Sequence, residues 1–136
     1  MTIVLDTNCL IQILPKLSPH RWLYDAILQG EIVVCITTEI IAEYEETINS
    51  FYDSTTLGGN ICQVLTQLPE TRKINVYFNW QLIQADPDDN KYVDCAVAAN
   101  ADFILTNDKH FNVLKNVDFP KIACLSMEDF EHSFRT

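Results

Sequence analysis

Apolar residues along this chain occur in two alternating patterns. Short runs rich in β-branched residues predict buried strands, and longer stretches with apolar residues three or four positions apart predict helices. The predicted strands are Thr2–Leu5, Ile32–Thr37, Ile74–Phe78, Phe103–Thr106 and Ile122–Leu125. The predicted helices cover about residues 20–29, 38–52, 57–68, 90–100 and 127–134. This alternation indicates an α/β fold: a three-layer α/β/α sandwich with a mostly parallel, five-stranded sheet. No repeat or linker interrupts it, so we predict a single domain over residues 1–136.

The helix predicted over residues 38–52 carries several glutamates beside its apolar stripe. Thr38 is the expected N-cap. Glu43 and Glu45 flank the two edges of the stripe, whereas Glu39 and Glu46 point away from it. Helical position therefore makes Glu43 and Glu45 candidates to reach a cleft, without choosing between them.

Composition excludes several classes of protein. The net charge is −10 and the sequence pI is about 4.5, which excludes nucleic-acid binding through a broad basic surface but not through bound metal. The apolar runs are too short to span a bilayer, and no basic segment precedes the first strand, so we expect neither a membrane segment nor a signal peptide. The five cysteines are odd in number and lack a C-x-x-C motif, which indicates reduced thiols in a cytoplasmic protein.

Acidic residues gather where ligands bind in parallel sheets, beyond the carboxyl ends of the strands. Asp6 directly follows the first strand and Asp108 follows the fourth, while Glu43 and Asp94 lie on helices that pack against the sheet. Each has an ordinary structural alternative: a helix cap for Asp6, a turn for Asp108, and a solvated helix face for Glu43 and Asp94. Asp89 is placed to cap the helix over 90–100.

Four carboxylates in one place require compensation. A like-charge pair at 4 Å costs roughly 4 kcal/mol at an effective dielectric near 20, so the group must take up protons or bind a cation. Carboxylate oxygens without clustered His or Cys select hard ions, chiefly Mg²⁺ or Mn²⁺. Such ions pair with a substrate phosphate, an arrangement suited to cleaving phosphodiesters.

The chain resembles the PIN-domain family, most closely its branch of VapC-like toxins from bacterial toxin–antitoxin systems. The resemblance runs in order through nearly the whole chain. It is carried by four segments, Leu5-Asp6-Thr7-Asn8, Thr37-Thr38-Glu39-Ile40-Ile41-Ala42-Glu43, Asp86 to Ala96, and Ala101 to Asp108.

The resemblance implies a metal-dependent endoribonuclease that hydrolyses RNA phosphodiester bonds, with a small antitoxin protein as partner. It places the family's acidic quartet on Asp6, Glu43, Asp94 and Asp108, which selects Glu43 over Glu45, and makes Asp6, Asp94 and Asp108 the metal ligands. Its small polar residues fall on Asn8 and Thr106. The Asp-rich loop is also characteristic of this branch, so Asp89 is an alternative or additional ligand to Asp94.

Few cations are available to bind RNA. Lys109, with Lys91 and Lys115, lies near the predicted rim and is a candidate phosphate contact, although surface solvation is the ordinary role of such lysines. His110 follows the last acid and could assist a leaving group, but an exposed histidine is the favoured interpretation. We therefore expect weak, salt-sensitive RNA binding unless a dimer pools these few cations, and we expect a homodimer.

Two other functions compete with this hypothesis. One is a PIN-like module that has lost catalysis and binds a protein partner, against which the retention of all four acids argues. The other is a receiver or phosphatase domain, which needs paired acids after a strand, whereas Asp6-Thr7-Asn8 supplies only one.

Overall fold

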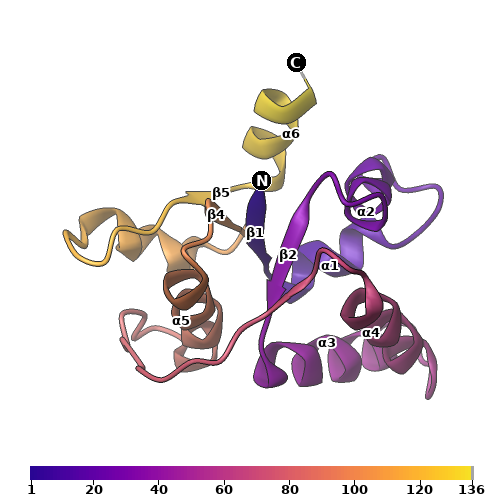
Figure 1. Ribbon diagram of the computed structural model, residues 1–136, viewed down its shortest axis with the longest axis horizontal. Helices are drawn as coiled ribbons and strands as arrows, with labels where there is room; N and C mark the ends of the chain where they lie inside the picture. Colours follow the sequence, from indigo (N-terminus) through magenta and orange to yellow (C-terminus); the bar gives the residue numbers. More distant parts are fainter. Residues whose placement is uncertain (136) are drawn as a thin grey trace.

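A five-stranded parallel sheet forms the centre of the molecule (Figure 1). The computed structural model describes residues 1–135. Its strands are β1 Thr2–Leu5, β2 Val33–Ile36, β3 Arg72–Lys73, β4 Phe103–Leu105 and β5 Cys124–Leu125. Their order is β3-β2-β1-β4-β5, and every neighbouring pair is parallel. The predicted α/β class and the parallel sheet are confirmed.

Helices connect the strands, as parallel crossovers require. The α-helices are α1 Thr7–Ile13, α2 Arg21–Leu28, α3 Thr38–Phe51, α4 Leu57–Gln67, α5 Asn90–Ala99 and α6 Met127–Arg135. The described residues also form two 3₁₀ segments: η1 Pro87–Asp89 directly before α5, and η2 Lys109–Asn116 between β4 and β5. The five predicted helices are confirmed within one residue at each end. Helix α1 was not predicted, because it is short and begins directly after a strand.

The core lies between the sheet and these helices. Figure 1 shows α5 on one side of the strands and α2 and α4 on the other. The residues Ile3, Val4 and Leu5 of β1 are at most 1% exposed, because this central strand is covered on both faces. Tyr44 of α3 donates a hydrogen bond from its hydroxyl to the carbonyl oxygen of Leu5, which fixes α3 against the end of β1.

The third strand differs from the prediction. The apolar run Ile74–Phe78 was expected in the sheet, but β3 is the preceding pair Arg72–Lys73. Ile74 still donates its backbone N–H to Ile36 O, 2.8 Å away. Beyond it the chain leaves the sheet, and Tyr77 and Phe78 are 90% and 63% exposed. The strand was predicted here because the run contains aromatic and β-branched residues. The prediction was wrong because no covering layer among the described residues buries Tyr77 and Phe78.

Two smaller expectations concern helix capping and the cysteines. The N-cap of α3 is Thr37 rather than Thr38, and its hydroxyl accepts a hydrogen bond from Ile40 N at 3.1 Å. All five cysteines are free thiols; four are buried and Cys124 is half-buried. Within residues 1–135, the helices are all too short or too polar to cross a bilayer.

Candidate functional site

The carboxyl ends of β1 and β4 bring two acids together. Leu5 pairs with Leu105 in the sheet, so Asp6 and Thr106 follow at the same edge. The Thr106 hydroxyl donates to Asp6 Oδ2 at 2.7 Å, and the backbone N–H of Asp108 donates to Thr106 Oγ1 at 3.0 Å. Thr106 therefore orients Asp6 and ties the position of Asp108 to it.

Asp6 is buried, with only 6% of its surface exposed. It occupies the N-cap position of α1, yet within the described chain its side chain does not cap the helix. Burial raises the pKa of Asp6, and the negative charges of Asp108 and Glu43 raise it further against the opposing hydrogen bond from Thr106. A cation bound beside Asp6 would therefore stabilise the ionised form of its carboxylate.

Glu43 reaches this site from α3. The Thr7 hydroxyl donates to Glu43 Oε2 at 2.6 Å, the Tyr92 hydroxyl donates to the same oxygen, and Lys91 Nζ lies 2.7 Å from Oε1. Burial acts to raise the pKa of Glu43, but the hydrogen bonds from Lys91, Thr7 and Tyr92 outweigh it and lower the pKa. Glu43 is therefore ionised and firmly positioned.

Asp89 adds a further acid from η1, at the start of α5. It is 9% exposed, and burial together with the charges of Asp108 and Asp86 raises its pKa to about 6. Its Oδ2 atom is buried and accepts no hydrogen bond from any residue that the structure describes. The capping bond expected from Asp89 to α5 is likewise not made among these residues. This carboxylate therefore has capacity for a further partner.

Asp94 lies on α5, which begins directly after Asp89, but its side chain is directed elsewhere. Its Oδ1 atom accepts a hydrogen bond from the backbone N–H of Trp80 at 3.0 Å. It lines a pocket with Glu39, Asn79 and Lys91, whereas Asp6 and Asp108 line a separate one. Burial raises the pKa of Asp94, and the charge that adds to this effect is that of Glu39. Asp94 therefore lines a different pocket from Asp6 and Asp108.

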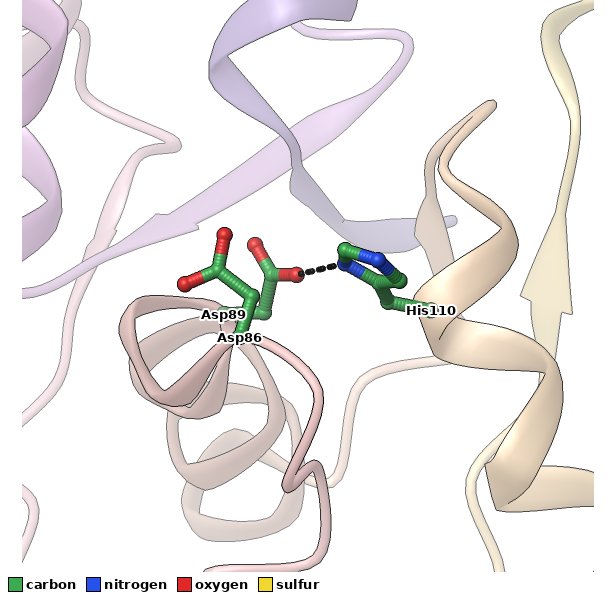
Figure 2. A group of neighbouring side chains, drawn as sticks. All are labelled: Asp86, Asp89 and His110. Carbon is green, nitrogen blue, oxygen red and sulfur yellow. Dashed lines mark ion pairs between the residues drawn. The ribbon is translucent and has the colours of Figure 1, made fainter.

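The remaining predicted residues lie around the rim. Asn8 lines the same pocket as Asp6 and Asp108, and Lys109 is the exposed first residue of η2. His110 is 44% exposed at its side chain, and its Nδ1 atom lies 3.4 Å from both Asp89 Oδ2 and Asp108 Oδ1. His110 is exposed as predicted, but its ring lies near two acids, of which Figure 2 shows Asp89.

Comparison with known proteins supports this architecture. A PIN-domain family model matches residues 2–110. The chain belongs to the PIN-domain family. This PIN domain also resembles the crystal structure of VapBC2 from Rickettsia felis bound to a DNA fragment from its promoter, with a TM-score of 0.58 and 17% identity. The likeness covers 93% of this chain and 98% of the other, and it shows a shared fold. No curated protein sequence matches this PIN domain significantly.

Sequence reasoning missed the contacts that hold Glu43 in this PIN domain, and it named Lys91 only as a residue near the rim. Thr7, Lys91 and Tyr92 hold its carboxylate from two elements, α1 and α5. Thr7 follows Asp6 directly, which is a usable signal. Lys91 and Tyr92 lie far from Glu43 in the sequence, and only the packing of α5 near α3 brings them there.

Proposed function

We propose that this chain is a metal-dependent endoribonuclease whose active site contains Asp6, Glu43, Asp89 and Asp108. The convergence of these carboxylates at one edge of the sheet carries the proposal. Asp6 lies close enough to Asp108 and Glu43 for their charges to raise its pKa, and Asp108 does the same to Asp89. Membership of the PIN-domain family supports a nuclease function.

The residues present fit a divalent cation. The donor set is mainly carboxylate oxygen, which Mg²⁺ and Mn²⁺ prefer. The buried Asp89 Oδ2 atom accepts no hydrogen bond from residues 1–135, and the exposed ring of His110 lies 3.4 Å from it. A buried carboxylate oxygen held only by so long a contact is costly to ionise unless a cation binds it. Asp6, Asp89 and Asp108 would hold the ion. When bound, such an ion neutralises the scissile phosphate and lowers the pKa of a water molecule.

The protein's own side chains organise this chemistry. Thr106 holds Asp6 in one orientation through its 2.7 Å hydrogen bond. Glu43 is held by Lys91, Thr7 and Tyr92, so it acts as a fixed negative charge that orients an attacking water. Asn8 and Lys109, at the open side of the rim, are in place to contact the RNA backbone. Asp94 anchors the segment that contains Trp80 and does not enter the reaction.

The biological role that fits best is the toxin of a toxin–antitoxin pair. The fold is shared with a toxin–antitoxin complex, VapBC2. We propose that this chain acts in the cytoplasm as one nuclease domain over residues 1–136, that it forms a homodimer, and that a small antitoxin protein inhibits it. A net charge of −10 favours a partner with basic segments. A neighbouring small gene whose product co-purifies with the chain and blocks cleavage would support this role.

The decisive experiment is RNA cleavage by the purified protein. We expect mixed-sequence RNA to be cut with Mg²⁺ or Mn²⁺ and to stay intact with a chelator. Asp6→Asn and Asp108→Asn each remove a carboxylate charge with little change in shape, so we expect a loss of roughly 100-fold or more in rate. Both variants should keep the wild-type circular dichroism spectrum. Cleavage at the wild-type rate by purified Asp6→Asn protein would refute the assignment.

A further inference from the structure

A second group of possible ligands adjoins the carboxylates of the proposed active site. Asp86 and Asp89 lie in the loop and 3₁₀ turn before α5, and His110 lies in η2, which follows β4. Figure 2 shows the Asp89 carboxylate facing the imidazole ring of His110, with the Asp86 carboxylate beside that of Asp89. One ligand atom from each of the three residues falls within 4.8 Å of the others. Asp86 was not among the predicted site residues, and His110 was expected to be an ordinary exposed histidine.

Two observations show that the residues of this group are only loosely paired with one another. Asp89 is 9% exposed, and its buried Oδ2 atom accepts no hydrogen bond within the part of the chain that the structure describes. His110 Nδ1 lies 3.4 Å from Asp89 Oδ2 and equally far from Asp108 Oδ1. These separations exceed the usual 2.7–3.2 Å of an N–H···O hydrogen bond. The ring therefore faces two carboxylates without forming a normal hydrogen bond to either.

The chemistry of this donor set differs from that of an oxygen-only site. Imidazole nitrogen binds divalent transition metals well, whereas Mg²⁺ prefers oxygen ligands and keeps its waters. Carboxylates from Asp86 and Asp89 supply the charge that a divalent ion requires. We propose that Asp86, Asp89 and His110 form a mixed carboxylate–imidazole site that binds a divalent transition metal in preference to Mg²⁺. The inference rests on the proposed function in sharing Asp89, but metal binding alone tests it.

Binding of Mn²⁺ to the purified full-length chain provides the test, without RNA. Titration followed by the electron paramagnetic resonance of free Mn²⁺ gives the affinity, and competition with Mg²⁺ gives the preference. We expect His110→Asn and Asp86→Asn to weaken Mn²⁺ binding by at least about ten-fold. His110→Asn should leave Mg²⁺ binding nearly unchanged. The matched control is His132→Asn on α6, which should leave both affinities at the wild-type value.

A direct readout of nitrogen ligation separates coordination from a general charge effect. Pulsed electron paramagnetic resonance of bound Mn²⁺ should show coupling to ¹⁴N in the wild-type protein and in His132→Asn, and this coupling should be absent in His110→Asn. A wild-type spectrum without ¹⁴N coupling, or equal losses of Mn²⁺ and Mg²⁺ affinity in His110→Asn, would overturn the inference. Thermal unfolding of each variant shows whether it is folded.

The same measurements distinguish this inference from the proposed function. If the chain binds Mn²⁺ through His110 but leaves RNA intact with every metal, the site stands and the nuclease function fails. If RNA cleavage requires a divalent ion but His110→Asn binds Mn²⁺ as the wild type does, the nuclease function stands and the mixed site fails.

Discussion

Asp89 and Asp94 show how the placement of single residues decides a site. Both are acids on or beside α5, and both are buried. Asp89 lies among Asp86, Asp108 and His110, whereas Asp94 binds the backbone of Trp80. A carboxylate that already accepts a backbone N–H serves structure, and one whose buried oxygen accepts no hydrogen bond from the described residues has capacity for a ligand.

Matched substitutions of these two residues should give opposite results. We expect Asp89→Asn to lower RNA cleavage by roughly 100-fold or more, because it removes a proposed cation ligand. Asp94→Asn keeps an amide oxygen that accepts from Trp80, so we expect near wild-type cleavage and a change in unfolding free energy below about 1 kcal/mol. Cleavage assays and urea unfolding of both variants measure this. Loss of cleavage in Asp94→Asn alone would restore Asp94 as the active-site acid.

The raised pKa of Asp89 predicts how stability depends on pH in the metal-free protein. Its pKa rises from 3.8 to about 6 in the folded state, so folding favours the protonated form. This group therefore contributes stability below about pH 4, and the contribution is lost as the pH rises through about 6. We expect the free energy of unfolding to fall by about 1–3 kcal/mol between pH 4 and pH 7 from this residue.

Urea unfolding with a chelator at several pH values tests that prediction. Asp89→Asn should flatten the dependence and stabilise the metal-free protein at pH 7, whereas the exposed neighbour Asp88→Asn should behave as the wild type. A dependence that is identical in the wild type and in Asp89→Asn would show that other groups cause it.

At the scale of elements, the packing of α4 on α3 depends on one glycine. Gly58 donates its N–H to Asn49 Oδ1 at 2.7 Å, and α3 and α4 are in extensive contact. A Cβ atom on Gly58 would lie 2.3 Å from the backbone oxygen of Glu45, whereas one on Gly59 would come no closer than 3.5 Å to the side chain of Glu45. Only the first position requires glycine for close approach.

Alanine substitutions at these two glycines form a matched pair. We expect Gly58→Ala to destabilise the protein by about 2 kcal/mol, because the helices must separate. Gly59→Ala should stabilise it by about 0.5–1 kcal/mol through higher helix propensity. Thermal and urea unfolding measure both. A Gly58→Ala protein as stable as Gly59→Ala would contradict the close packing of α3 and α4.

At the scale of the whole molecule, negative charge is abundant, and part of it is concentrated at one edge of the sheet. The chain carries a net charge of −10, and several of its acids meet at one edge of the sheet. A divalent ion that binds only the folded state stabilises it by about 2.7 kcal/mol at a concentration 100-fold above its dissociation constant. We expect Mg²⁺ or Mn²⁺ to raise the melting temperature of the wild-type protein.

Two controls separate specific binding from screening. NaCl at matched ionic strength should raise the melting temperature much less, because it reduces repulsion without occupying the site. Asp6→Asn should lose most of the divalent effect. Equal effects of NaCl and Mg²⁺ on the wild-type protein would show that screening alone accounts for the stabilisation.

The sequence by itself determined the order of the elements and two of the acids in the site. Hydrophobic periodicity is a local property, so it located five helices and four of the strands. Asp6 and Asp108 follow strands directly, and parallel strands end at one edge, so their meeting followed from sequence position.

Tertiary structure alone decided the rest. Asp89, in η1 before α5, lies beside Asp108 and Asp86, whereas Asp94, further along α5, accepts a hydrogen bond from Trp80. The packing of α5 near α3 brought Lys91 and Tyr92 to Glu43. The chain left the sheet after β3 because no other element of the described chain covers Tyr77 and Phe78. These outcomes depend on contacts between segments far apart in the chain, and a local pattern of residues carries no information about them.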